Sequence, residues 1–241
     1  MRDFATVGWY NASYKLVEGF HFIPTITMMA IYPALSRFHI KNKDLRNFLY
    51  IKSFKYMLIV SLSLAIGTTF VAGSLIELVY GPAFSQSILT LKILMWANVF
   101  IFINFIMGYF LNAMNEQRLF TASVAVGVVL NIILNFFLIQ SMGHNGAAIA
   151  TLVTQAITTI LLYYFIAKKG YQVNPIKDLW LVYLCAIVLF IVCLMFSQAA
   201  LYVIIPVAAI SYLVILLLTK EIGYDEFLLI QNFTKKILRK V

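Results

Sequence analysis

Two charged residues three positions apart, Lys15 and Glu18, stand in the stretch NASYKLVEGFHFIPTITMMAIYPAL, which is otherwise apolar enough to lie in lipid. A charge at the centre of a bilayer costs about 2.5–3.5 kcal/mol on insertion scales. Residues three apart are neighbours on one face of a helix, so mutual pairing lowers the cost of each charge. We therefore expect this pair to face protein or a water-filled cavity. The alternatives are a purely structural ion pair, or a Lys15 side chain that extends to the membrane interface.

The same stretch contains the elements of a hinge. Pro24 has no amide hydrogen and crowds the carbonyl of Phe20, which predicts a kink near this point, and Gly19 adds local backbone freedom. A charged pair beside a kink is typical of a helix that moves and lines a cavity.

Amide side chains recur in the other apolar stretches. Asn131 and Asn135 in NIILN lie one helical turn apart on the same face, and the same spacing joins Asn104 to Gly108 and Thr151 to Gln155. In lipid such amides usually form hydrogen bonds between helices. We favour a role in helix packing for them, with contact to a substrate in a cavity as the alternative.

No motif of a soluble enzyme is present. The sequence has no HExxH, GxxxxGK[ST], GxGxxG or GxSxG pattern, and its three histidines are scattered. Cys185 and Cys193 fall in one apolar run without the spacing of a metal site. We expect no enzymatic activity, metal or cofactor, and leave open a cation or proton that drives transport.

The composition is that of an all-α integral membrane protein. Hydrophobic residues make up 63% of the 241 residues and charged residues 11%, against about 25% charged in soluble domains. A membrane-spanning helix needs about 20 mostly apolar residues, and the chain offers about seven such stretches. They lie near residues 5–35, 56–79, 87–112, 119–139, 146–167, 179–197 and 199–219.

Basic residues predict the orientation in a cell membrane. Fifteen of the 18 Lys and Arg residues fall in alternate connections and in the tail 220–241. By the positive-inside rule these regions are cytoplasmic, with the N-terminus of the chain outside. This placement accounts for the net charge of +9 without nucleic acid. The tail is predicted to be a basic amphipathic segment at the membrane surface. The sequence begins without a signal peptide, although its N-terminus is predicted to be outside. An odd number of preceding spans that start in the cytoplasm would explain this, so we expect the chain to be the second half of a longer protein.

Three segments carry a resemblance to a known family: VGWYNASYKLVEGFHFIPTITMMAIYPALSR, LIELVYGPAFSQSILTLKILMWA and LNIILNFFLIQSMGHNGAAIATLVTQ. They resemble the C-terminal half of polysaccharide-type flippases in the multidrug, oligosaccharidyl-lipid and polysaccharide exporter (MATE-like) superfamily. The resemblance implies two lobes around a central cavity, in a fourteen-helix fold with two extra C-terminal helices. Residues 1–170 would then form about five spans of the C-terminal lobe, residues 171–219 the two additional helices, and residues 220–241 the cytoplasmic tail.

The resemblance also implies a substrate site. Lipid II flippases carry an Arg followed by Leu where this chain has Lys15 and Leu16, and that basic residue lines their cavity. Lys15 would therefore attract the pyrophosphate of a polyprenyl-linked sugar, as a point charge without the fork of Arg. Asn11 would line the same cavity, and Glu18 would hold Lys15 or take part in coupling to a cation or proton.

The expected function is the flipping of lipid-linked oligosaccharide precursors across the cytoplasmic membrane by alternating access. Its partners would be membrane lipids, the polyprenyl-pyrophosphate-linked sugar, and a missing N-terminal half or partner chain. The alternatives are a multidrug exporter of the same superfamily and a truncated remnant that does not transport. A seven-helix retinal protein or receptor is not favoured, because residues 199–219 contain no Lys and no pair of extracellular cysteines is present.

Overall fold

The computed structural model describes residues 4–41, 43–171, 173–174 and 177–196, together with residues 203, 206–207, 209–212 and 214. All regular elements in these ranges are helices, and no strand occurs among them. The elements are α1 (Phe4–Glu18), α2 (Phe22–Lys41), α3 (Lys43–Tyr80), the short 3-10 turn η1 (Pro82–Phe84), α4 (Ser87–Ala113), α5 (Gln117–Met142), α6 (His144–Lys168) and α7 (Trp180–Met195).

Four helices of the described part of the chain are long and apolar enough to cross a membrane. These segments are Leu45–Tyr80, Ser87–Ala113, Gln117–Met142 and His144–Lys168, and Trp180–Met195 is a shorter apolar helix. A helix satisfies its own backbone hydrogen bonds, which is what lipid requires of a spanning segment. The predicted all-α membrane fold is therefore confirmed. The tail 220–241 and most of the stretch 199–219 lie outside the described residues.

The predicted first span, residues 5–35, is wrong as a single kinked helix. The structure breaks it between α1 and α2, where the amides of Phe20 and His21 donate to carbonyls only three residues earlier, at 3.0 and 2.9 Å. The Phe20 carbonyl, which Pro24 would otherwise crowd, accepts from the amide of Ile23 at 3.1 Å. Pro24 thus lies in the first turn of α2, where its missing amide hydrogen costs nothing.

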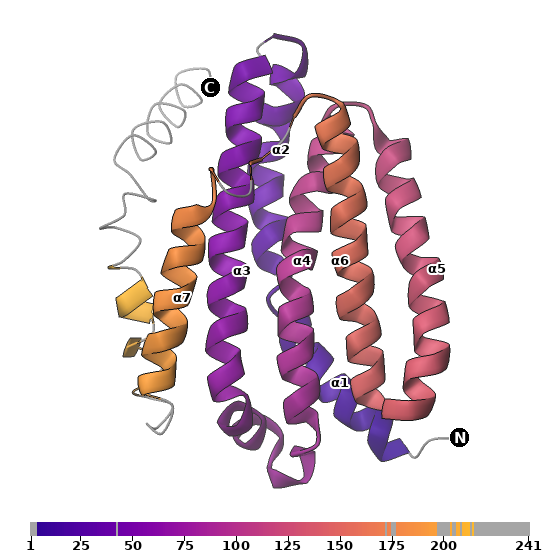
Figure 1. Cartoon of the computed structure of the whole chain (residues 1–241), viewed down its shortest axis with the longest axis vertical. Helices are drawn as coiled ribbons and strands as arrows, with labels where there is room; N and C mark the ends of the chain where they lie inside the picture. Colours follow the sequence, from indigo (N-terminus) through magenta and orange to yellow (C-terminus); the bar gives the residue numbers. More distant parts are fainter. Residues whose placement is uncertain are drawn as a thin grey trace, which may run out of the picture.

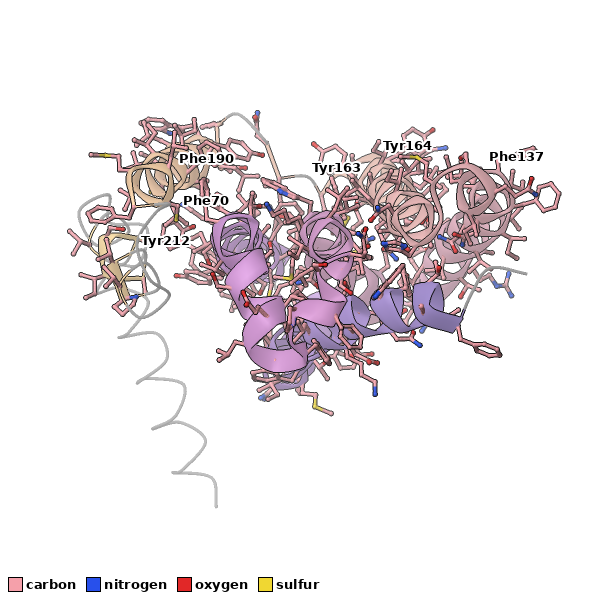
Figure 2. All side chains as sticks on the ribbon, turned by 90° about the horizontal axis from the view of Figure 1, so that it is seen from below. Phe70, Phe137, Tyr163, Tyr164, Phe190 and Tyr212 are labelled. Carbon is pink, nitrogen blue, oxygen red and sulfur yellow. The ribbon has the colours of Figure 1, made fainter. Side chains whose placement is uncertain are left out.

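The helices form a curved row with α1 and α2 packed against one face (Figures 1 and 2). The order across the row is α7, α3, α4, α6, α5, and each neighbouring pair is in contact. Helices α1 and α2 both contact α4, which is the most buried of the four spanning helices, whereas α5 is the least buried. Helix α4 is therefore the central element on which the other helices are positioned.

Aromatic and aliphatic side chains fill the contacts of α3 with its neighbours. The rings of Tyr50 and Phe110 stack at 4.1 Å between α3 and α4, and both residues are fully buried. On the opposite side Phe70 of α3 meets Phe190 of α7 with ring centroids 5.2 Å apart (Figure 2). The hydroxyl of Tyr212 donates to the carbonyl of Ile59 at 3.1 Å, so the described part of the stretch 199–219 also packs on α3.

Small residues bring α5 and α6 together directly after the turn that joins them. A Cβ atom added to Gly146 would lie 2.1 Å from the backbone oxygen of Leu138, and Ala150, one helical turn further on, is fully buried. Helix backbones approach this closely only where side chains are small. The motif GHNGAAIAT is thereby explained as a packing element.

The basic connection between the predicted first two spans differs from the expectation. Helix α3 begins at Lys43 rather than near residue 56, and Arg46 is 1% exposed instead of lying in a hydrated loop. The Arg46 guanidinium lies 4.3 Å from the ring centroid of Tyr171 and 5.9 Å from that of Phe110. A planar guanidinium stacks well on aromatic faces, which lets a cation be buried here. At the same end of the row Lys169 forms an ion pair with Glu116.

Candidate functional site

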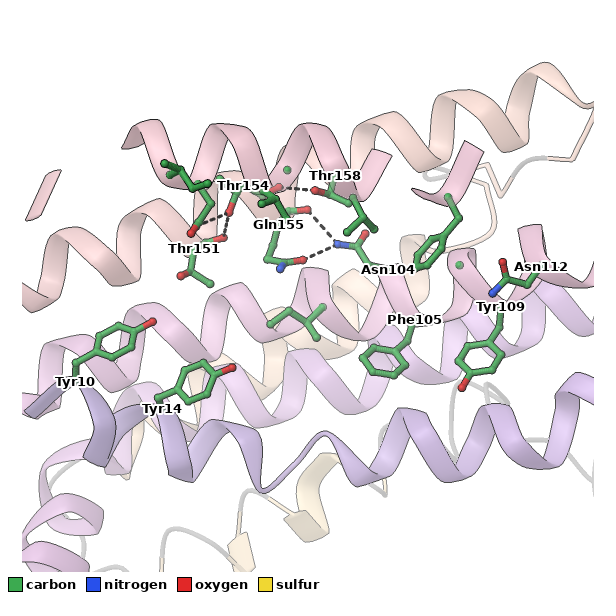
Figure 3. Close-up of a pocket in the computed structure, with 18 of the residues that line it drawn as sticks. Tyr10, Tyr14, Asn104, Phe105, Tyr109, Asn112, Thr151, Thr154, Gln155 and Thr158 are labelled. Atoms are coloured by element: carbon green, nitrogen blue, oxygen red, sulfur yellow. Dashed lines mark hydrogen bonds between the residues drawn. The ribbon is translucent and has the colours of Figure 1, made fainter. Parts of the chain in front are cut away.

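A cavity of about 860 Å³ lies between α1, α4, α5 and α6 (Figure 3). Its polar lining residues are Asn11, Asn104, Asn112, Asn131, Thr151, Thr154, Gln155 and Thr158. Its aromatic lining residues are Tyr10, Tyr14, Phe105, Tyr109 and Phe120. A cavity of this size is within the range of about 300–1,000 Å³ found for small-molecule sites. Its lining, within the described part of the chain, contains no ionisable carboxylate or basic side chain.

Asn104 of α4 and Gln155 of α6 join the two helices beside the cavity. The Nδ2 of Asn104 donates to the Oε1 of Gln155 at 2.9 Å and to its backbone oxygen at 3.3 Å. The hydroxyl of Thr159 donates to the Oδ1 of Asn104 at 2.8 Å. Both ends of the Asn104 amide are therefore occupied, and the Gln155 side chain is held in one orientation.

A second amide chain joins α5 to α6. The Nδ2 of Asn135 donates to the Oδ1 of Asn131 at 2.8 Å, and the Nδ2 of Asn131 donates to the hydroxyl of Thr154 at 3.2 Å. Asn131 lines the cavity, but Asn135 is not among its lining residues. The sequence spacing placed both amides on one face of α5, and the structure shows that they bond to each other and that Asn131 continues the chain to α6.

Two glycines make room for the cavity wall. A Cβ atom at Gly108 of α4 would lie 2.5 Å from the ring of Phe120, and one at Gly127 of α5 would lie 2.5 Å from the hydroxyl of Thr158. Both glycines line the cavity. Any larger residue at either position would displace a side chain of the wall.

The predicted charged pair is placed differently from the expectation. Lys15 and Glu18 are both exposed on α1, and no ion pair joins these two described residues. Neither is among the lining residues of the cavity, whereas Asn11 is. The predicted mutual pairing of these two side chains is therefore wrong. That Lys15 and Glu18 face a larger cavity between two lobes stays a prediction.

The break between α1 and α2 is anchored to α4. The Nε2 of His21 lies 3.1 Å from the Oδ1 of Asn98, which is fully buried. The hydroxyl of Thr25 donates to the carbonyl of His21 at 2.8 Å and so occupies a backbone group near the break. Gly19 is exposed beside it, while Pro24 is buried. The hinge role of Gly19 and Pro24 stays a prediction.

Several cavity residues were not singled out from the sequence. Thr154 and Thr158 are two of them; they recur at helical spacing with Thr151, which the sequence had indicated together with Gln155, and the three share one face of α6. Tyr10 and Tyr14 of α1 lie one turn apart and also belong to the cavity. Periodic polar residues in an apolar helix were the signal available for the threonines. Aromatic residues in membrane helices give no comparable signal, because they are common on lipid-facing surfaces as well.

The described residues contain no group of three or more His, Cys, Asp and Glu side chains that could hold a metal ion. The cavity thus offers amides, hydroxyls and aromatic rings, which bind by hydrogen bonding and packing. Such a set can select a ligand but has no nucleophile paired with a base.

No family model matches the sequence, but curated proteins similar to it are found. The chain is 25% identical over 163 residues to Agl15 of Haloferax volcanii, named a probable low-salt glycan biosynthesis flippase, covering 67% of this chain and 34% of that protein. It is 26% identical over 182 residues to AglR of the same organism, named a probable flippase, covering 71% and 37%.

A solved structure has the same fold. The lipid II flippase MurJ, in an inward closed conformation, matches with a TM-score of 0.72 and 16% identity, over 90% of this chain and 47% of that one. The chain thus spans about a third of the first two curated relatives and about half of the structural one. In sequence the chain is similar to proteins named as probable flippases, and in fold it is similar to about half of a lipid II flippase.

Proposed function

We propose that the chain is part of a transporter that moves lipid-linked oligosaccharide precursors across the cytoplasmic membrane. The observation that carries this proposal is the uncharged polar cavity enclosed by apolar helices, in a fold shared with a lipid II flippase over 90% of the chain. The names of Agl15 and AglR support the same activity. The chain has exposed apolar side chains for lipid, and its cavity carries amide and hydroxyl groups that could bind a hydrophilic head group.

Transport would proceed by rocking of two lobes about a shared site, without covalent chemistry on the protein. This chain would supply the C-terminal lobe, and a preceding segment or a partner chain would supply the other. The break between α1 and α2 is the element of this half best suited to absorb the movement, since its backbone hydrogen bonds are already irregular. Lys15 on α1 would then face the anionic linker of the cargo, and Glu18 would contribute to any coupling by a cation or proton.

The orientation also belongs to this proposal. The ends of α4 and α6 and the starts of α5 and α7 meet at one end of the row, where Arg118, Lys168 and Lys169 lie. A basic end of this kind is typical of the cytoplasmic side. The N-terminus of the chain would then be outside and its C-terminus in the cytoplasm.

The first test is to read the DNA upstream of the codon for Met1 and determine the mass of the complex that contains this chain in its native membrane. A contiguous or co-purifying set of further spans identifies the complete transporter. That transporter, reconstituted in vesicles, should move a fluorescent polyprenyl-pyrophosphate-linked sugar between leaflets. Movement of a lipophilic cationic dye in place of this cargo would overturn the proposal in favour of a drug exporter.

Lys15→Ala in that transporter should abolish movement of the lipid-linked sugar, because the anionic linker would lose its cation. Lys92→Ala is the matched control, since Lys92 lies on α4 and is not among the cavity-lining residues. Unchanged transport by the Lys15 variant would remove Lys15 from the site.

A further inference from the structure

Four of the aromatic rings that line the cavity are arranged as two parallel pairs. Tyr10 and Tyr14 of α1 stack with an interplanar angle of 18° and centroids 5.9 Å apart. Phe105 and Tyr109 of α4 stack with an angle of 20° and centroids 6.5 Å apart. Figure 3 shows the four rings in a row along one side of the cavity, with polar side chains of α6 on the other side.

The polar side is pre-oriented by its own hydrogen bonds. Asn104 binds the Oε1 of Gln155, and no described residue accepts a hydrogen bond from the Gln155 Nε2, which leaves that amino group available to a ligand. At the far end of the cavity the Oδ1 of Asn112 is buried and has no hydrogen-bond partner within the described ranges. A buried acceptor without a partner is costly, so a rotation of the Asn112 side chain that brings this oxygen to a ligand hydroxyl in the cavity would be favourable.

An anionic group does not fit this lining. Transfer of a pyrophosphate into a cavity without a cation would leave its charge desolvated and unpaired. A sugar ring fits both sides, because its edge carries neutral hydroxyls that donate and accept hydrogen bonds. Its faces carry C–H groups that pack on flat aromatic surfaces. The volume of about 860 Å³ leaves room for such a ring beside the row.

We propose that this cavity holds the sugar portion of the cargo, with a sugar ring packed on the Tyr10–Tyr14 and Phe105–Tyr109 pairs and its hydroxyls bound by Gln155 and Asn112. The proposal rests on the proposed function and divides the recognition of one cargo between two places. The glycan enters the uncharged cavity within this half, and the pyrophosphate stays outside it, on the side of the exposed α1 surface that carries Lys15.

Binding to the full chain tests this directly. The chain is purified in a zwitterionic detergent that contains no sugar, and saturation-transfer NMR measures binding of neutral disaccharides built from glucose, galactose, mannose or N-acetylglucosamine. Inorganic pyrophosphate is the anionic probe. At least one disaccharide should bind at millimolar concentration, and pyrophosphate should not compete with it. Absence of binding by all four disaccharides, or displacement by pyrophosphate, overturns the proposal.

Variants at Tyr14 show whether the sugar packs on the Tyr14 ring or whether a substitution there weakens binding by disturbing the fold. Tyr14→Leu should weaken disaccharide binding about threefold to tenfold, whereas Tyr14→Phe, which keeps the ring, should bind within about twofold of the natural chain. Tyr164→Leu is the control, because Tyr164 is 56% exposed on α6 and does not line the cavity. Tyr14 is itself 38% exposed, so its replacement leaves the packed interior intact, which a melting curve of each variant checks. Equal binding by Tyr14→Leu and the natural chain contradicts the proposal.

The vesicle assay distinguishes this proposal from the proposed function. Transport of the lipid-linked sugar by the complete transporter, together with full activity of its Tyr14→Leu variant, would retain the proposed function and reject the sugar site. Binding of disaccharides without any transport would retain the sugar site and reject flipping as the function.

Discussion

Replacing Gly146 by Ala tests the close approach of α5 and α6. The new Cβ atom would lie 2.1 Å from the oxygen and 2.5 Å from the carbon of the Leu138 carbonyl, against about 3.4 Å for ordinary contact, so a shortfall of about 1.3 Å must be relieved. Both contacts are backbone atoms, which move only if the helices separate. Overpacking of this kind costs about 1–3 kcal/mol, and the gain in helix propensity from Gly to Ala returns at most about 1 kcal/mol. We therefore expect a net loss of about 2 kcal/mol.

For a chain of this length a loss of that size lowers the melting temperature by about 4–8 °C. The assay is thermal unfolding in detergent, followed by the fraction of protein that remains monodisperse in size-exclusion chromatography. Gly67→Ala in α3 is the matched control, because nothing lies within 4 Å of a Cβ atom at that position. Gly67→Ala should leave the melting temperature unchanged or slightly raised. A Gly146→Ala protein as stable as the control would refute the packing argument.

Three further predictions concern buried polar groups. Arg46→Lys should lower the melting temperature in detergent, since an ammonium cannot stack as the guanidinium does, whereas Arg118→Lys at an exposed position should have no effect. Asn98→Leu should cost about 1–2 kcal/mol because it leaves His21 without its partner, and the added change His21→Leu should recover part of this loss in a double-mutant cycle. Asn135→Leu should lower thermal stability more than transport per folded molecule, and the reverse result would make Asn135 a substrate residue.

The spanning helices could be predicted from the sequence because lipid demands long apolar runs. The stretches 87–112, 119–139 and 146–167 fall within α4, α5 and α6. The start of α3 could not be placed, because Lys52 and Lys55 suggested a hydrated connection. Lysine is a good helix former, so basic residues mark the end of the apolar run and not the end of the helix.

The position of the irregular backbone between α1 and α2 was predicted, but the sequence predicted a kink in one helix where the structure has two helices. Pro24 and Gly19 indicate irregular backbone, yet they do not specify whether a helix bends or stops. Contacts with other helices also hold the break in place, and here the Oδ1 of Asn98 on α4 lies within hydrogen-bond distance of the His21 imidazole. That contact joins residues 77 positions apart, so no local pattern could reveal it.

For Lys15 and Glu18 the sequence could not show which face of the helix they lie on. The spacing of Lys15 and Glu18 allows an ion pair on one helical face, but spacing does not say which face is covered by other helices. Residues Ala12, Ser13 and Val17 are the buried side of α1, and they place Lys15 and Glu18 on the uncovered side. An amphipathic pattern would have indicated this, but α1 has apolar residues on most of its surface.

The amides form the contacts between helices that the sequence favoured for them. Asn104 donates to Gln155 and accepts from Thr159, so its hydrogen-bonding capacity is spent between helices. Gln155 spends its Oε1 on Asn104, and no described residue accepts from its Nε2. The contact between Asn104 and Gln155 therefore fixes the orientation of the Gln155 side chain, which lines the cavity. Asn104→Leu should consequently disturb both stability and binding, whereas Asn11→Leu, at an exposed cavity position, should affect binding alone.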